Sequence, residues 1–426
     1  MLAAVLIFLG VYVGFVVSHR WRYVIAWAGV GVALVVGALR PGEIVPSISW
    51  NVLGIFAGTL VIAELFIISK VPETIADTLI NRSPSLGVAF FSIITFTSVL
   101  SMFIENVAAV LIVAPVALQL ARKAKVSPVP VIIGLAITSN LQGTATLIGD
   151  PPSMILGAAM KMNFMDFFVY PMRDGSGAVK PGIFWFVQIG AAASLAVLFF
   201  FFKGMKRKPE RIPVTAVGSL VPSALLVLMI MLLSVATFFD PGFLWFGGTV
   251  CVAEAILGVA WYSLRDRGRV VRILKGFDYP TTLFLAGVFV LVGMLERRGV
   301  IEEFVVRLQS LGSVHPFILF SAVVWASVAL SAFIDNVPYV TVMLPVVIRF
   351  AHDAALPPEL LVFGLLIGAC IGGNVTPIGA SANIVAMGLL HRERSRVSFL
   401  GFVRMGLPFT IVATASASFA LWLVYR

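Results

Sequence analysis

The stretch Leu100-Ser-Met-Phe-Ile-Glu-Asn-Val107 returns 230 positions later as Leu330-Ser-Ala-Phe-Ile-Asp-Asn-Val337. Both copies place a carboxylate and an asparagine between two apolar legs, in segments 85–121 and 313–350. The same ungapped shift aligns Pro128, Gly134, Gly143, Thr146 and Gly149 with Pro358, Gly364, Gly373, Thr376 and Gly379. Shared apolar composition would explain matching Val and Leu, but not matching Asn, Pro, Gly and Thr. The sequence therefore predicts an internal duplication.

The composition is that of a membrane protein. Of the 426 residues, 60% are hydrophobic and 12% are charged, whereas soluble domains carry roughly 25% charged residues. The mean hydropathy is +1.05. This balance excludes an ordinary soluble protein and a disordered chain, and the short alternating segments of a β-barrel are not found. We expect an all-α polytopic membrane protein with about ten transmembrane helices plus two re-entrant helical hairpins.

Apolar runs place the predicted spans. A helical span needs roughly 20 mainly apolar residues, and the candidates are 1–18, 22–40, 51–69, 182–202, 218–238, 241–263, 280–297 and 401–425. The first run lacks a charged leader and is interpreted as a span, not as a cleaved signal peptide. Two further segments, 128–160 and 358–390, have polar centres rich in Gly and Pro and are predicted to be broken helices.

These elements suggest a division of the chain into four parts. N-terminal spans occupy 1–49, a first repeat 50–202, a cytoplasmic linker 203–217 and a second repeat 218–426. The first repeat holds hairpin 85–121 and broken helix 128–160, and the second holds hairpin 313–350 and broken helix 358–390. The hairpins are interpreted as re-entrant because their legs 107–121 and 337–350 are short for a full span.

The basic residues set the predicted orientation. The net charge is +10, and Lys and Arg cluster in loops 203–211 and 265–275, which the positive-inside rule assigns to the cytoplasm. This distribution explains the basic balance better than nucleic-acid binding does, so no nucleic-acid partner is expected. The first hairpin then opens inward and the second outward, which is an inverted-topology repeat of the kind found in secondary transporters. Both termini are predicted outside a cell inner (plasma) membrane.

Carboxylates within apolar segments are the leading functional candidates, because each costs about 2.5–3.5 kcal/mol to insert at a helix centre. Glu105 and Asp335 sit at matching hairpin turns and are predicted to couple protons. Their alternative role is to cap helices that face headgroups or a buried lysine. Asp150 has no acidic counterpart in the second repeat and is either a coupling carboxylate or a cap. Glu64 and Glu254 lack repeat partners, and a structural role is favoured for both.

Neutral polar residues beside these carboxylates are predicted to bind substrate. They are Asn106, Asn336, Asn140, Thr144, Thr146, Asn374 and Thr376. Irregular backbone inside a membrane survives where protein or a water-filled cavity covers it, and half-helix ends there offer partial charges to ions and polar substrates. Each of these residues could equally cap a half-helix without touching substrate.

An enzyme is the weaker class. The four histidines fall in or beside loops, no Walker A sequence is present, and Leu147-Ile-Gly-Asp150 lacks the first glycine of a GxGD protease. The two cysteines, Cys251 and Cys370, form no metal-ligand spacing, so no metal site or cofactor is expected. Broken elements with paired carboxylates favour alternating access over an open channel.

Four motifs resemble one family. They are Ser101-Met-Phe-Ile-Glu-Asn-Val107, Gly143-Thr-Ala-Thr-Leu-Ile-Gly-Asp-Pro-Pro152, Ala332-Phe-Ile-Asp-Asn-Val337 and Gly372-Gly-Asn-Val-Thr-Pro-Ile-Gly379. Together they are similar to the ion-transporter superfamily, which includes ArsB-type arsenite efflux permeases, the P-protein group, NhaD-type Na⁺/H⁺ antiporters and divalent anion:Na⁺ symporters. The resemblance implies a scaffold part and a transport part, with substrate held between two hairpin tips and two broken helices.

The hairpin tips favour one branch of the superfamily. The dicarboxylate symporters carry Ser-Asn-Thr there, whereas this chain has Glu105-Asn-Val107 and Asp335-Asn-Val337. Ionised carboxylates would repel an anion but suit neutral As(OH)₃. The resemblance to ArsB-type permeases thus implies proton-coupled efflux of arsenite or antimonite, with Na⁺/H⁺ antiport or an anion or organic-acid carrier as alternatives. A pump of this type can associate with a cytosolic ATPase, for which loops 203–211 and 265–275 are the expected docking places.

Overall fold

The computed structural model describes residues 1–18, 21–173, 177–265, 267–309, 315–354 and 356–426. These residues are almost entirely helical, apart from one two-stranded antiparallel ribbon. Within them, seven helices are long and apolar enough to cross a membrane, and six shorter apolar helices accompany them. The expected all-α polytopic fold is confirmed.

The elements follow the predicted segments closely. The first half contains α1 (Leu2–Val17), α2 (Arg22–Val35), η2 (Pro41–Glu43), α3 (Ile44–Ser47), α4 (Trp50–Ile68), α5 (Val71–Arg82), α6 (Leu86–Ser101), α7 (Asn106–Ala124), α8 (Val129–Gly143), α9 (Pro151–Met160), η3 (Phe164–Phe167), β1 (Val169–Pro171), β2 (Val179–Pro181) and α10 (Ile183–Phe202). The second half contains α11 (Val221–Ser234), α12 (Ala236–Phe239), α13 (Phe246–Ser263), α14 (Arg267–Gly276), α15 (Tyr279–Arg297), α16 (Val300–Gln309), α17 (Pro316–Ser331), α18 (Asn336–Asp353), α19 (Pro358–Gly372), η4 (Gly373–Val375), α20 (Ser381–Arg392) and α21 (Phe399–Tyr425).

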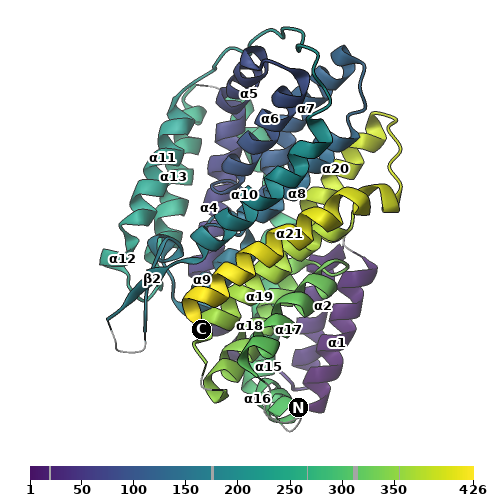
Figure 1. The fold of residues 1–426 in the computed structure, drawn as a ribbon. Coiled ribbons are helices and arrows are strands. Elements are labelled where there is room, and N and C mark those ends of the chain that lie inside the picture. The colour runs from purple at the N-terminus through teal and green to yellow at the C-terminus, as the bar shows by residue number, and fades with distance from the viewer. Residues whose placement is uncertain (19–20, 174–176, 266, 310–314, 355) are drawn as a thin grey trace.

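The two predicted hairpins are α6–α7 and α17–α18. In Figure 1, α6 and α7 lie in the upper half of the molecule and α17 and α18 in the lower half. The two copies of the repeated sequence thus enter the protein from opposite ends, as an inverted-topology repeat requires. Positions 313 and 314, where the second hairpin was expected to begin, lie outside the described residues.

The second leg of each hairpin is longer than its apolar run. Helix α7 has 19 residues and α18 has 18. Helix α7 continues through Arg122 and Lys123, because basic side chains in a last turn interact favourably with the helix dipole. It is therefore long enough to cross a bilayer, although the apolar run 107–121 alone is short.

The two broken segments also follow the repeat. Helix α8 ends at Gly143 and α9 begins at Pro151, while α19 ends at Gly372 and α20 begins at Ser381. Proline at the first helical position has the right φ and lacks an N–H that would be left without a partner. The irregular backbone between the half-helices lies inside the protein and is covered by it, since its side chains are mostly buried.

Helices α4 and α13 pack so closely that only glycine fits between them. A Cβ on Gly58 would lie 2.3 Å from the backbone carbonyl carbon of Cys251, and one on Gly54 would lie 2.8 Å from Gly248 Cα. Helix α2 packs on α1 and α15. Of these helices, α2, α4 and α15 contribute side chains to the central cavity.

Several elements were not expected from the apolar runs. Helices α5, α14 and α16 and the β1–β2 ribbon have too few consecutive apolar residues to be found as spans. The span predicted over 22–40 ends earlier, at Val35, because Gly37 adopts a φ of +74°, a left-handed conformation typical of a residue that follows a helix.

Candidate functional site

The hairpin tips meet at one cavity. Glu105 and Asp335 both line a cavity of about 450 Å³. Each is also the N-cap of the following helix: a carboxylate oxygen of Glu105 accepts the Ala108 N–H at 3.0 Å, and one of Asp335 accepts the Val337 N–H at 3.0 Å. Capping and lining the cavity are therefore combined in the same side chains.

Equivalent serines hold both tips. The Ser101 hydroxyl donates to Asn106 Oδ1 at 2.8 Å, and the Ser331 hydroxyl lies 2.5 Å from Asn336 Oδ1. Each serine also contacts the broken helix of its own repeat: Ser101 reaches the Ser139 carbonyl at 3.0 Å, and Ser331 the Ala369 carbonyl at 2.6 Å. All these pairs are related by the 230-residue shift, so the repeat extends to individual hydrogen bonds.

The breaks in the helices are tied to the tips in the same symmetric way. Thr146 donates to the Met102 carbonyl, and Thr376 donates to the Ala332 carbonyl. A Cβ on Gly149 would lie 2.5 Å from the Gly143 carbonyl oxygen. Each break is thus hydrogen-bonded to the tip of the hairpin in its own repeat, and gives a backbone carbonyl of that tip the partner that a low-dielectric interior requires.

An asparagine cluster joins the two repeats beside the cavity. Asn140 Nδ2 donates to Asn374 Oδ1 at 2.8 Å and to Asn383 Oδ1 at 2.9 Å. Asn383 in turn donates to the carbonyls of Gly373 and Thr376. These three side chains are nearly fully buried, so the cluster fixes one broken helix against the other.

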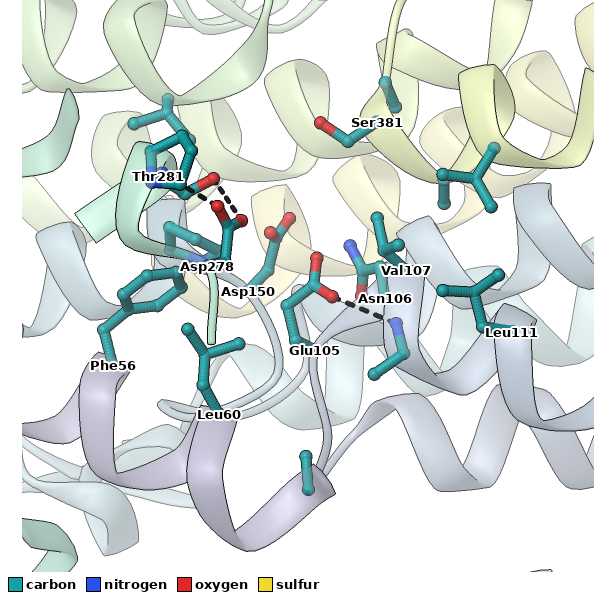
Figure 2. A pocket seen from close by; sticks show the side chains of 18 of the residues that line it. Phe56, Leu60, Glu105, Asn106, Val107, Leu111, Asp150, Asp278, Thr281 and Ser381 are labelled. Carbon is teal, nitrogen blue, oxygen red and sulfur yellow. Dashed lines mark hydrogen bonds between the residues drawn. The ribbon is translucent and has the colours of Figure 1, made fainter. Parts of the chain in front are cut away.

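Further acidic groups face the same space. Figure 2 shows the carboxylates of Glu105, Asp150 and Asp278 close together, with Asn106 beside Glu105. Asp278 caps α15 through the Thr281 N–H at 3.0 Å, and Glu64 of α4 also lines the cavity. Five carboxylates therefore surround this cavity: Glu64, Glu105, Asp150, Asp278 and Asp335.

One arginine balances part of this charge. Arg22 Nη1 lies 2.9 Å from Asp335 Oδ2, and Arg22 is the only Lys or Arg among the described residues that line the cavity. With every group ionised, the lining would carry a formal charge of −4. Because buried like charges repel one another strongly in a medium of low dielectric, such a site favours bound cations or protons.

The structure brings six of the ten predicted site residues to the cavity. They are Glu105, Asn106, Asn140, Asp150, Asp335 and Asn336. The other four, Thr144, Thr146, Asn374 and Thr376, are buried beside it and hydrogen-bond to protein groups. Those four support the broken helices in the described conformation, and substrate contact by them stays a prediction.

Sequence reasoning missed four polar residues of the cavity lining. They are Arg22, Asp278, Thr281 and Ser381. Asp278-Tyr-Pro-Thr-Thr282 has the pattern of a helix start, which could have indicated Asp278. Arg22 lies 313 residues from Asp335, and no local pattern connects them. Glu64, for which a structural role was favoured, also lies at the cavity.

This fold and this site define a membrane transporter. Two solved structures are similar in fold. The YdaH transporter of Alcanivorax borkumensis has a TM-score of 0.59 at 15% identity, over 90% of this chain and 86% of that one. MtrF of Neisseria gonorrhoeae, described with a class of antimetabolite efflux pumps, has a TM-score of 0.57 at 12% identity, over 92% and 84%.

The chain belongs to the citrate transporter family, CitMHS, whose profile matches residues 12–368 and 267–426. It is 28% identical over 442 residues to an uncharacterized transporter of Mycobacterium tuberculosis, covering 99% of this chain and 98% of the relative. It is 27% identical over 397 residues to the human P protein, covering 74% of this chain and 46% of the relative. The ion-transporter superfamily is confirmed, and the protein is a transporter, not an enzyme. The ArsB-type specificity stays a prediction.

Proposed function

We propose that this protein is a proton-coupled secondary active transporter that exports arsenite or antimonite across the inner membrane. The observation that carries the proposal is the cavity with five carboxylates and one described arginine. A free anion would be repelled there. Arsenite is neutral As(OH)₃ at neutral pH, and its hydroxyls can bond to the carboxylate and amide oxygens of the lining.

The proposed cycle uses three carboxylates. Glu105, Asp150 and Asp335 take up protons from outside, which weakens their hold on substrate, and they release the protons inward after the cavity changes its opening. The hairpins and broken helices form the moving transport part in this proposal, and the remaining spans form the scaffold. Alternating access then follows from the inverted repeat, because exchanging the conformations of the two halves exchanges the side that is open.

An organic-acid carrier is the second candidate. Membership of the citrate transporter family favours it, and Arg22 offers a guanidinium suited to carboxylate. The acidic lining sets a condition on this candidate. A polycarboxylate would have to arrive protonated or with a bound cation to avoid repulsion from Glu105 and Asp150.

Two further parts of the proposal concern the cytoplasmic face. In this proposal, loops 203–211 and 265–275 lie in the cytoplasm and both chain termini lie outside. A cytosolic ATPase subunit, if the protein works with one, would dock on these loops through their positive charge.

The test is uptake into everted membrane vesicles under an imposed pH gradient. Accumulation of arsenite that collapses with a protonophore and is indifferent to Na⁺ would support the proposal. Accumulation of citrate, with or without a divalent cation, would support the organic-acid carrier instead. Decay of the pH gradient on adding Na⁺, without uptake of either substrate, would overturn both and indicate Na⁺/H⁺ antiport.

A further inference from the structure

The two hairpin tips have similar sequences but differ in whether their carboxylate forms an ion pair. Asp335 is held by the Arg22 guanidinium at 2.9 Å, with both side chains largely buried at 13% and 16% exposure. Glu105, at the equivalent position of the first repeat, accepts the Ala108 N–H. It makes no ion pair within the part of the chain that the structure describes.

Arg22 is positioned by the scaffold, not by the hairpin. Its Nη2 donates to Thr281 Oγ1 at 2.9 Å, and the Thr281 hydroxyl donates in turn to Asp278. Its guanidinium carbon lies 4.8 Å from the centre of the Phe284 ring, a cation–π distance. Two neighbouring helices, α2 and α15, therefore hold the charge that meets the tip of the second hairpin.

The surroundings of the pair reinforce this difference. Among the described residues, the titratable groups around it are Tyr12 of α1, Asp278 of α15, Cys370 of α19, and Glu105 and Asp150 of the cavity lining. None of these five carries a positive charge. Among the described residues, the Arg22 guanidinium forms an ion pair with Asp335, whereas Glu105 and Asp150 line the same cavity without an ion pair of their own.

We propose that the two tips have separate roles: the Arg22–Asp335 pair is a substrate-recognition element that stays ionised, and Glu105 carries the transported proton. The proposal rests on the proposed function and revises one part of it: Asp335, counted there among the proton-carrying carboxylates, is assigned to substrate recognition instead. A paired guanidinium and carboxylate offer both hydrogen-bond donors and acceptors without net charge. They suit a neutral, hydroxyl-rich or acid-bearing molecule, whereas a carboxylate without an ion pair at the cavity wall is suited to bind and release a proton.

The first test needs no substrate. Dicyclohexylcarbodiimide modifies protonated carboxyl groups in apolar surroundings, and mass spectrometry locates the modified residues. In membranes that contain the protein without substitutions, we expect the reagent to modify Glu105 and to leave Asp335 unmodified. Arg22→Gln should expose Asp335 to the reagent, whereas Arg22→Lys, which keeps the charge, should leave it protected. If the reagent modified Asp335 and Glu105 equally in the protein without substitutions, the proposal would be overturned, whatever the protein transports.

The second test uses vesicle transport of the substrate found above. The variant Arg22→Gln/Asp335→Asn removes both charges together, so neither is left buried alone. We expect its KM to rise at least tenfold while its transport still responds to the pH gradient. Glu105→Gln should lose gradient-driven accumulation but keep exchange of labelled for unlabelled substrate.

Lys70→Gln is the matched control: Lys70 forms an exposed ion pair with Glu73, outside the cavity lining and outside loops 203–211 and 265–275, and this variant should behave as the protein without substitutions. An unchanged KM in the double variant, or loss of the pH response in it, would show that the Arg22–Asp335 pair does not have the recognition role. Absence of any transport by the unmodified protein would instead refute the proposed function and leave the carbodiimide result to decide this proposal.

Discussion

At the scale of single residues, the acidic tip residues show that one side chain can both cap a helix and line the cavity. Glu105 uses one oxygen to accept the Ala108 N–H, and its carboxylate still lines the cavity. The cap holds the side chain at the start of α7 and limits its rotamers. A carboxylate whose position is fixed in this way loses less conformational entropy when it binds a partner.

Asp240 is a cap outside the spans, and its removal should cost stability. It accepts the N–H groups of Leu244, Trp245 and Phe246 at 2.7–2.9 Å. Burial by itself would raise the pKa of Asp240, but the three hydrogen bonds outweigh burial and lower it. Asp240→Asn should therefore lower the free energy of unfolding at pH 7 by about 1–2 kcal/mol. The measurement is the melting temperature, which should fall accordingly.

The pH dependence of this effect has a definite sign. A depressed carboxyl pKa contributes stability that is present above the unfolded value of about 3.9 and is lost as pH falls through the folded value. The difference in melting temperature between Asp240→Asn and the unmodified protein should thus narrow below about pH 4. A difference that stays constant from pH 7 to pH 3 would contradict this account.

At the scale of elements, the broken helices depend on close backbone packing at matching glycines. A Cβ on Gly149 or on Gly379 would lie 2.5 Å from the carbonyl oxygen of Gly143 or Gly373, respectively. The obstacle is backbone, which cannot rotate away as a side chain can. The half-helices are therefore held in register by contacts that any side chain would break.

Alanine at either of these glycines should abolish transport. We expect Gly149→Ala and Gly379→Ala to reduce vesicle uptake at least tenfold with poor recovery of folded protein. Gly388→Ala is the control in the same broken segment, because a Cβ there meets nothing within 4 Å. Helix propensity predicts that it is neutral or stabilising by up to about 1 kcal/mol. Normal uptake by both Gly149→Ala and Gly379→Ala would refute this role of the breaks.

Glu254 of α13 is a buried carboxyl without a hydrogen bond among the described residues. It is 3% exposed, and neither of its oxygens has a hydrogen-bond partner among the described residues. A buried polar group without a partner costs about 1–3 kcal/mol. Glu254→Met should therefore raise the melting temperature and leave vesicle uptake intact. Loss of uptake in a stable Glu254→Met protein would show instead that the cycle uses this carboxyl.

At the scale of the whole molecule, two oppositely placed halves enclose one site. Figure 1 shows the chain ends in the lower half and the region around α5 at the top. The cavity receives side chains from α2, α4, α15, both hairpins and both breaks. No single repeat builds it, so its charge is a property of the assembled protein.

The orientation in the membrane can be tested with introduced cysteines. The native Cys251 and Cys370 are buried, which keeps background labelling by a membrane-impermeant maleimide low. We expect Lys208→Cys to be labelled in everted vesicles and Val179→Cys to be labelled in right-side-out vesicles. The reverse pattern would invert the proposed topology, and with it the predicted direction of each hairpin.

Much of the fold was predictable because its signals are local. Apolar run length places a span, and the acidic-Asn turn with its matching Pro and Gly residues reveals the repeat. Helix ends were less predictable: α7 extends through Arg122 and Lys123, since charged side chains at a membrane surface can continue a helix that hydropathy would end. The amphipathic helices α14 and α16 were not predicted, because their apolar residues are not consecutive and form no apolar run.

The site, like the fold, was predictable in part. The sequence by itself determined the membrane class, the inverted duplication and the two acidic tips, because apolar runs, short motifs and basic loops are each visible without knowledge of which helices pack together. Only the tertiary structure decided that Arg22 pairs with Asp335, that Asn140 bonds to Asn374, and that Glu64 and Asp278 join the cavity. Such pairs form between segments hundreds of residues apart when helices dock, and docking is decided by packing over whole helix faces. The chemical difference between two nearly identical tips therefore arises from the scaffold helices against which each is packed.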